Sequence, residues 1–451
     1  MKPLEDRPLG RANSPLLVPD FRPFRCLRLG RYLVLPLLFM LFASGAAQAC
    51  QRAVGSTFAD QGQACALEGS AADDPNLLAL PGTLTRSGNP VDIVSGRKSL
   101  RRLHLQASLQ GSDLFGQGLP LTWAVFYDSG EPQLESSPDT KQAREHPAGD
   151  LGVAWRHGFE LRLTSQQSGE GKTANNPSLI VNIHQADGVV HRFRYRPERG
   201  VFAADQAELG EIQTFDAGPS RHWIWRQVGG RQAHFDAAGR LSGWRSPLGQ
   251  RLDLHYSKTG RLIEIAQSAR DHAGSLRKRA SLHLQWDAHQ VLIEQVELKQ
   301  ERDNAAATML AQCSYRYDRQ ALNNPLLVGV ACKQTQQAVQ DWREQYFYED
   351  ARFRQALTRV RLERSKEPAL EAHYAYDAWR RVLKSQGIGE GTAQALRIEY
   401  SDPSSKEAPW RQLSRAGQSM AYRFEALPGP GEQASQDSPY GRWRRQSDTP
   451  C

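Results

Sequence analysis

The sequence feature that most constrains the fold is a short unit that occurs twice between residues 234 and 265. The first copy reads His-Phe-Asp-Ala-Ala-Gly-Arg-Leu from His234, and the second reads His-Tyr-Ser-Lys-Thr-Gly-Arg-Leu from His255. A strand-end aromatic residue, a capping Asp or Ser and a glycine that can adopt positive φ are the components of a hairpin turn. Because recurrence at a regular spacing is typical of repeat architectures, the segment predicts successive β-hairpins.

Weaker copies follow at a spacing of about thirty residues, compared with about twenty between the first two. Residues 282–286 and 372–376 alternate in polarity, which indicates strands with one buried face. Gly239 and Gly260 are expected at positive φ. Arg380 replaces this glycine in the copy at Tyr376, so we expect a looser or different turn there, without positive φ. The landmark residues of the repeats are Phe235, Asp236, Gly239, Arg240, Tyr256, Gly260, Arg261, Trp286, Tyr317, Asp318, Tyr348, Tyr376 and Asp377.

The expected fold class is all-β: an open, curved antiparallel sheet strip of consecutive β-hairpins, with nearly no helix in residues 90–400. Ten Trp, thirteen Tyr and fifteen Phe beside only four Met favour sheet over a helix bundle. Strand twist curves such a strip, and an open strip keeps at least one unpaired edge. We therefore expect a partial shell rather than a closed cage.

The pattern Tyr-Asp-x-x-Gly-Arg-Leu resembles the YD repeat of the rearrangement-hot-spot (Rhs) family, and residues 346–358 resemble another recurrent phrase of that family. Residues 88–96, 119–127 and 151–161 are similar, in the expected order, to an Rhs N-terminal module. The resemblance covers about residues 86–400. It implies a β-strip of the kind that winds into a toxin-enclosing shell in full-length members. This sequence has only about seven repeat-like units and neither the Asp-Pro-x-Gly-Leu self-cleavage phrase nor a C-terminal toxin domain, so encapsulation and toxicity are not carried over.

The N-terminal segment has the features of a secretory signal. A basic stretch that includes Arg28 and Arg31 precedes the apolar run 32–42, and Ala47-Gln48-Ala49 forms an A-x-A cleavage site. The apolar run is short for a transmembrane helix. The expected organisation is a signal peptide at 1–49, a leader or linker at 50–85, an N-terminal Rhs-type β module at 86–225, a YD-repeat β-sheet region at 226–425 and a disordered basic tail at 426–451.

The charge of the chain does not indicate nucleic-acid binding. Residues 1–49 hold seven Lys or Arg and three Asp or Glu, and so contribute +4 of the formal +8. The remaining arginines are dispersed through predicted strands and form no recognition motif. We expect no nucleic-acid partner, and no membrane span after cleavage of the signal.

Export would permit disulfides. Cys50 with Cys65 and Cys313 with Cys332 are the local pairings, each closing a short loop worth about 3 kcal/mol. The Cα atoms of Cys313 and Cys332 should lie within about 7 Å of each other. Cys451 is left over. Lipidation of Cys50 is the alternative to its pairing, but Ala47-Gln48-Ala49 is a poor lipobox.

No catalytic, cofactor-binding or metal-binding residue is expected. The twelve histidines form no cluster with the three or four converging ligands that zinc needs, and no nucleophile elbow, phosphate loop or dinucleotide motif is present. Trp223 and Trp225 share one strand face, where they could stack on a sugar or peptide. Cross-strand packing of these indoles is the favoured interpretation.

The predicted function is that of a secreted, non-enzymatic Rhs/YD-repeat β-scaffold. It would act in the bacterial cell envelope, periplasmic or outer, or as a truncated relative of a toxin-delivery shell. The expected partner is another protein, such as a secretion component or a second Rhs chain. The alternative is a glycan- or peptide-binding module that uses exposed aromatic residues. An enzyme whose site only the fold assembles is ranked last.

Overall fold

A computed structural model describes most of the chain between residues 86 and 426 and a short segment beyond. The expected signal peptide, the leader, Cys50, Cys65 and Cys451 lie outside the described residues. All described residues belong to one compact unit, 53–451. The described ranges are 86–87, 91–93, 95–107, 119–130, 149–167, 179–204, 206–217, 220–270, 275–302, 305–320, 325–335, 341–364, 367–401, 410–426 and 443–445.

This part of the chain is all-β, as the repeats predict. Its only helical segments are two single 3₁₀ turns, η2 (Ala207–Leu209) and η3 (Thr392–Gln394). The strands are β1 Arg86–Ser87, β2 Val91–Asp92, β3 Ser99–Gln106, β4 Thr122–Asp128, β5 Trp155–His157, β6 Arg162–Gln167, β7 Leu179–His184, β8 Val190–Arg196, β9 Val201–Ala203, β10 Glu211–Ala217, β11 Ser220–Arg226, β12 Gln232–Phe235, β13 Leu241–Arg245, β14 Arg251–Tyr256, β15 Leu262–Arg270, β16 Leu276–Trp286, β17 Ile293–Arg302, β18 Ala305–Asp318, β19 Leu326–Gln334, β20 Trp342–Phe347, β21 Arg359–Arg364, β22 Leu370–Tyr376, β23 Val382–Gln386, β24 Leu396–Tyr400, β25 Trp410–Arg415, β26 Gln418–Ala426 and β27 Trp443–Arg445.

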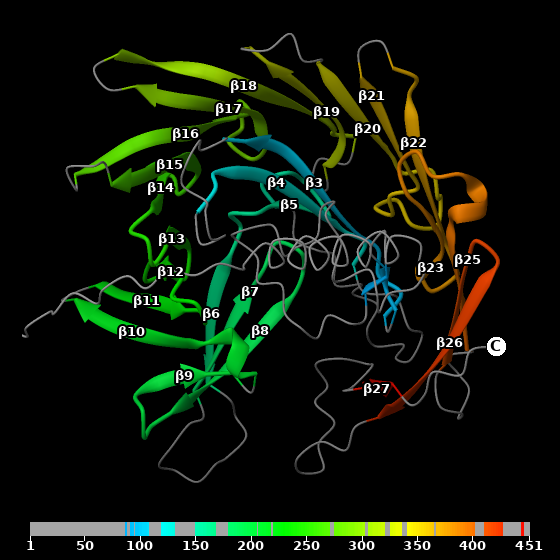
Figure 1. The fold of residues 1–451 in the computed structure, drawn as a ribbon, viewed down its shortest axis with the longest axis horizontal. Coiled ribbons are helices and arrows are strands. Elements are labelled where there is room, and N and C mark those ends of the chain that lie inside the picture. The colour runs from blue at the N-terminus through cyan, green and yellow to red at the C-terminus, as the bar shows by residue number, and fades with distance from the viewer. Residues whose placement is uncertain are drawn as a thin grey trace, which may run out of the picture. The chain divides into compact units, whose positions relative to one another are not determined.

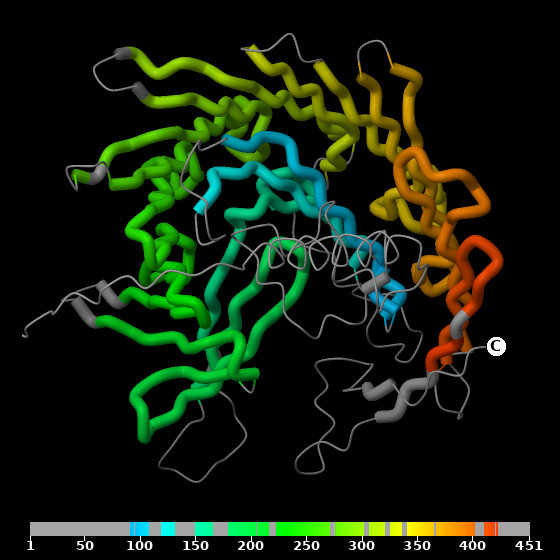
Figure 2. Tube along the Cα trace, viewed as in Figure 1, coloured from blue at the N-terminus to red at the C-terminus, as the bar shows by residue number. Residues whose placement is uncertain are grey.

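One long antiparallel sheet contains the 22 strands from β6 to β27, each paired with the next in sequence (Figure 1). The sheet is not closed into a barrel, because no strand ladder joins β6 to β27 within the described residues. The trace bends steadily from strand to strand, as the twist of consecutive hairpins requires (Figure 2). The predicted open strip of hairpins is therefore confirmed.

Alternation along each strand explains why these segments pair. In β22, Ala372, Tyr374 and Tyr376 are buried on one face, while the residues between them are more exposed. A one-residue register shift accompanies several of the landmark aromatics, as at Tyr256 and Tyr376, and the extra residue lies on the return strand. The aromatic landmarks lie at or next to the ends of alternate strands: Phe235, Tyr256, Trp286, Tyr317, Tyr348 and Tyr376.

A second sheet, β3–β4–β5, packs against the inner face of the long sheet's bend (Figure 1). The Trp123 indole N–H donates to the Tyr315 hydroxyl over 2.7 Å, and the Trp155 indole N–H donates to the Tyr348 hydroxyl over 2.8 Å. Both indoles are fully buried. The main core therefore lies between the two sheets, and aromatic residues from both sides fill it.

The first part of the long sheet curls further, so that β6 meets the turn between β12 and β13. An isolated bridge pairs Arg162 with Arg240, and the Leu163 N–H donates to the Gly239 carbonyl over 2.8 Å. We call this contact the seam. It joins two segments that lie far apart in sequence but only six strands apart in the sheet.

Two of the expected boundaries fall inside the long sheet. The boundary expected between residues 225 and 226, from the N-terminal module to the repeats, falls within β11, which pairs with β12. β27 comes from the segment expected to form the tail, and it pairs with the end of β26. None of the helices described has the length or the apolar character needed to cross a bilayer.

Candidate functional site

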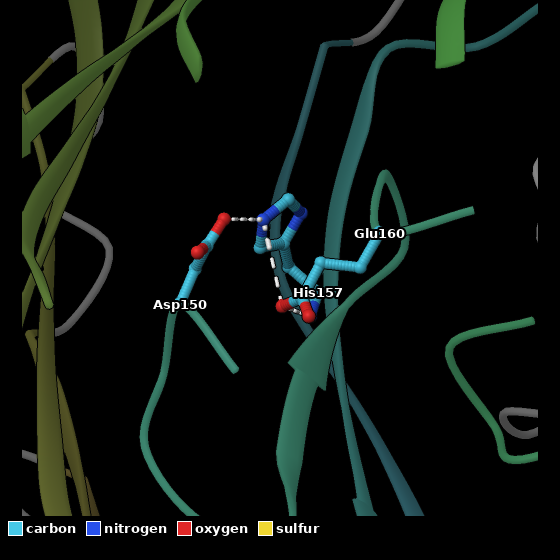
Figure 3. Close-up of side chains that lie close together, drawn as sticks. All are labelled: Asp150, His157 and Glu160. Atoms are coloured by element: carbon cyan, nitrogen blue, oxygen red, sulfur yellow. Dashed lines mark hydrogen bonds and ion pairs between the residues drawn. The ribbon is translucent and has the colours of Figure 1, made fainter. Parts of the chain in front are cut away.

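The structure brings together three polar residues that sequence reasoning did not select: Asp150, His157 and Glu160 (Figure 3). His157 ends β5 and is buried against Trp123, with the ring centroids 4.6 Å apart. His157 Nε2 lies 3.3 Å from Asp150 Oδ2 and 3.6 Å from Glu160 Oε1. The available sequence signal was the pattern His-x-x-Glu, whose histidine follows Asp150 by seven residues.

Hydrogen bonds define how this histidine is oriented. The Phe159 N–H donates to His157 Nδ1 over 3.3 Å, which leaves Nε2 to carry the ring proton toward Asp150. Glu160 accepts the His157 backbone N–H over 3.0 Å, and burial raises the pKa of this carboxyl. Arg156 lies 3.2 Å from Glu160, and Arg261 lies 3.7 Å from Asp150.

This arrangement suits a clamp better than a cation site. A metal-bound histidine normally donates its second ring nitrogen's proton to an acceptor, whereas His157 Nδ1 faces an N–H. The surrounding segment also holds the two sheets together. The Asp150 carbonyl accepts the Ile293 N–H over 3.0 Å, and the Val153 N–H donates to the Pro325 carbonyl over 2.9 Å. We call Asp150, His157 and Glu160 the inter-sheet clamp.

A serine–histidine contact on the outer face of β16 does not form a nucleophilic pair. Ser281 Oγ lies 3.0 Å from His283 Nε2, but the serine is fully buried and its hydroxyl donates to Glu301 over 3.0 Å. Glu264, the other nearby acid, lies 3.9 Å from the same Nε2. A catalytic triad needs an acid on the opposite ring nitrogen to orient the base.

The buried polar centre between the sheets is an ion pair. Arg102 on β3 directs Nε and Nη2 to the carboxylate of Glu344 on β20, and the Tyr346 hydroxyl donates to the same carboxylate. Burial acts to raise the pKa of Glu344, but the charge and hydrogen bonds of Arg102, together with His104 and the Tyr346 hydroxyl, hold this pKa below its usual value. The pair links β3 of the inner sheet to β20 of the long sheet.

Two later repeat turns that have lost the glycine keep the positive φ of the first two turns. Gly239 and Gly260 have φ of 76° and 80°, as predicted. Gln290 and Arg380 occupy the same position with φ of 56° and 66°. The prediction that Arg380 avoids positive φ is therefore wrong.

The turn's first residue explains this outcome. Asp377 Oδ1 accepts the N–H groups of Trp379 and Arg381 over 2.9 and 2.8 Å, and the Arg380 N–H donates to the Asp377 carbonyl over 3.2 Å. These bonds hold the backbone in the left-handed region whatever side chain residue 380 carries. The strain at a non-glycine residue is of order 1–2 kcal/mol.

The recurring aromatic residues are linked from copy to copy. Each donates its hydroxyl or indole proton to a backbone carbonyl at or within two residues of the start of the preceding copy's return strand. Phe235, in the first copy, has no such proton. The donor–acceptor pairs are Tyr256–Leu241, Trp286–Leu262, Tyr317–Ile293, Tyr348–Leu327, Tyr376–Leu357 and Tyr400–Val382, at 2.6–2.8 Å. We call this series the aromatic ladder.

The arginine of the repeat connects the same neighbours from outside. Arg240 pairs with Asp236 of its own turn over 2.8 Å and lies over the Tyr256 ring of the next copy, 5.0 Å from its centroid. Arg381 repeats this arrangement with Asp377 and Tyr400. The Tyr-Asp-x-x-Gly-Arg-Leu pattern is thus a structural unit in which the aspartate caps its own turn, while the aromatic residue and the arginine contact an adjacent copy.

The expected pairing of Cys313 with Cys332 has suitable geometry. The two residues are opposite each other on β18 and β19, with Cα atoms 4.1 Å apart and a disulfide between them. Trp223 and Trp225, weighed above as a binding platform, are buried in the core. The exposed large aromatics among the described residues are Tyr195 and Phe215.

No protein-family model matches the chain, and no curated protein does. Among solved structures, the crystal structure of TcdB2-TccC3-TEV matches with 10% identity and a TM-score of 0.19, over 73% of this chain and 23% of that chain. A porin-like protein from Bacteroides uniformis matches with 9% identity and a TM-score of 0.22, over 56% and 95%. The Photorhabdus luminescens Tc holotoxin pore matches with 8% identity and a TM-score of 0.16, over 73% and 24%. This chain thus spans about a quarter of the Tc toxin chains; the similarity is distant, and no residue role follows from it.

Proposed function

We propose that this protein is a secreted, non-enzymatic β-scaffold of the Rhs/YD-repeat type that acts in the bacterial cell envelope, or as a relative of a toxin-delivery shell. The observation that carries the proposal is that β3–β5 occupies the inner face of the long sheet. Trp123, Trp155 and Tyr127 form hydrogen bonds with the repeats from within. A strip whose inner face is a packed core supports a scaffold better than a container.

The repeat residues favour the same function. In the aromatic ladder and the turn ion pairs, the hydroxyl, indole, carboxylate and guanidinium groups bond to the backbone or to each other. A tyrosine hydroxyl that donates to a buried carbonyl is committed to structure. The clamp residues likewise belong to the segment that docks on the long sheet through the Asp150 carbonyl and the Val153 N–H. Side chains that face away from the core, such as His255 and His373, remain for a partner, and the proposed partner is another protein.

Export is the first part of the proposal to test. The full chain is expressed with its N-terminal segment in a bacterium, which is then fractionated. We expect a periplasmic or extracellular product that begins at Cys50 and contains an oxidised Cys313–Cys332 pair under non-reducing mass mapping. A cytosolic product that keeps Met1 and has both thiols free would contradict export.

Partner binding is tested in the native envelope. A photo-crosslinker placed at His255 or His373, on strand faces away from the core, should capture one discrete protein. A matched crosslinker at the fully buried Val296 should capture none. Equal labelling at all three positions, or capture of glycan instead of protein, would contradict a protein-binding scaffold.

A further inference from the structure

Two irregularities coincide at Arg380. Its backbone is in the left-handed region, at a φ of 66°, where the first two copies of the repeat have glycine. Its guanidinium Nε and Nη2 are shielded from solvent, yet no acceptor among the described residues lies within hydrogen-bonding distance of either nitrogen. Strained residues and unsatisfied buried polar groups are each uncommon in folded proteins and often accompany a binding role.

The unsatisfied atoms form one particular edge of the guanidinium. Nε and Nη2 are the pair that other arginines of this chain, Arg102 among them, use to hold a carboxylate side-on. Arg97 binds Asp128 through this edge, and Arg352 binds Asp350 through it at 2.9 and 2.7 Å. Such two-point pairing matches the spacing of two oxygens on a planar oxoanion.

The carboxylate nearest to Arg380 in sequence is already occupied. Asp377 Oδ2 accepts the Arg381 Nε–H over 2.7 Å, and Asp377 Oδ1 accepts two backbone N–H groups of the turn. The turn therefore holds one carboxylate and two guanidinium groups. The charge of Arg380 acts on the buried phenols of Tyr127 and Tyr376, neither of which accepts a hydrogen bond from it.

We propose that the Nε/Nη2 edge of Arg380 is a binding site for a carboxylate or phosphate group carried by a ligand. The residue as a whole is partly exposed, so the side chain can turn this edge toward solvent by rotation about its own torsions. An oxoanion bound there neutralises the excess positive charge of the turn and supplies both missing acceptors. This site lies beyond the scaffold role, which does not require it.

Glycine at this position would relieve the backbone strain but could not bind the oxoanion. This separates the two properties experimentally. Gln290 is the matched control, because it has the same turn position and positive φ but no charge. Arg380→Gly removes both the strain and the guanidinium, whereas Gln290→Gly removes the strain and an uncharged amide that donates to the Asp287 carbonyl over 3.2 Å. Arg380→Lys keeps the charge and removes the two-point edge.

The experiment measures the unfolding temperature of the mature full chain at pH 7 in chloride, acetate or inorganic phosphate, at constant ionic strength. We expect a saturable rise of about 2–4 °C for the wild type in acetate or phosphate relative to chloride. The larger rise identifies the preferred head group. Gln290→Gly should keep the full response, Arg380→Lys should lose more than half of it, and Arg380→Gly should show none.

Two results would overturn the proposal. One is a wild-type unfolding temperature that is the same in all three anions. The other is an anion-dependent rise that persists in Arg380→Gly, or in Arg380→Lys should the glycine variant fail to fold. In either case Arg380 would be a structural residue of the turn.

Discussion

The turns at Gly239 and at Arg380 follow the same backbone path at opposite ends of the repeat region, but the surrounding structure constrains them differently. A Cβ on Gly239 would lie 2.0 Å from the Leu163 carbonyl oxygen at the seam. The turn at Arg380 accommodates a long side chain at the same φ. In the later turn it is the ion pair that is buried: the Arg381 and Asp377 side chains are 4% and 10% exposed, against 45% and 31% for Arg240 and Asp236.

This difference shows that the left-handed turn itself does not require glycine. The capping aspartate sets the backbone conformation in both turns. Glycine is indispensable only where a second strand approaches the turn, as β6 does at Gly239. Where the turn instead packs into the core, its stability depends on the buried Asp–Arg pair. The repeat sequence thus has one geometry and two separate constraints.

The largest expected effect comes from filling the seam. Gly239→Ala should destabilise the protein by about 4 kcal/mol or more, because it adds a backbone overlap to the strain of positive φ. Gly260→Ala is the matched control: its φ is 80°, but its Cβ would meet only the flexible Arg240 Nη1 at 3.0 Å. It should lose only about 1–2 kcal/mol. Urea unfolding measures both, and equal losses would refute the importance of the seam.

The capping aspartates should show the opposite ranking. Asp377→Ala leaves the buried Arg381 without its carboxylate, which predicts a loss of about 3 kcal/mol or more. Asp236→Ala breaks an exposed ion pair with Arg240 and removes the cap of the turn, so we expect a stability loss of about 1 kcal/mol. Denaturant midpoints of the two variants give the comparison. A larger loss at Asp236 would contradict the two-constraint interpretation.

Acid should weaken the contact between the two sheets through His104, which lies on β3 and packs against Tyr315 of β18. Its Nδ1 lies 2.9 Å from the Tyr315 hydroxyl, and burial lowers its pKa to about 4. The unfolded chain binds this proton near pH 6.5, so the stabilising contribution is present above that pH and is lost as the pH falls from about 6.5 to about 4. We expect His104 to contribute a loss of roughly 2–3 kcal/mol over this range. Unfolding curves of His104→Gln, which cannot titrate, should show a correspondingly weaker pH dependence; an unchanged dependence would exclude His104.

The smallest expected effect is that of the aromatic ladder, and it should be similar in both regions. Tyr256→Phe and Tyr400→Phe each remove one donor to a backbone carbonyl while keeping the ring, so each should lose about 1 kcal/mol. Phe235→Tyr tests the first copy, which has no preceding copy to accept its proton, and it should not stabilise the protein. Thermal unfolding of the three variants measures these changes in stability. A gain at Phe235 would show that the ladder begins earlier than proposed.

The sequence alone was sufficient to predict the all-β strip and its landmarks. Residues 372–376 alternate because each side chain of a strand faces opposite to its neighbour, and this period is visible without tertiary contacts. The positive φ of Gly239 and Gly260 could be predicted because the turn chemistry is contained within five residues. Local spacing likewise suggested Cys313 and Cys332 as a pair on neighbouring strands.

Tertiary structure decided the features that depend on distant contacts. The need for glycine at Gly239 comes from Leu163, and the clamp at His157 depends on a segment that docks on Ile293 and Pro325. The conformation of Arg380 was predicted wrongly because side-chain propensity was weighed without the two hydrogen bonds of Asp377. Propensity and periodicity act over a few residues, and they determined strands, turns and repeat. Close approach, burial of charge and satisfaction of hydrogen bonds join residues far apart in the chain, so only the folded structure could determine the seam, the clamp and the unsatisfied edge of Arg380.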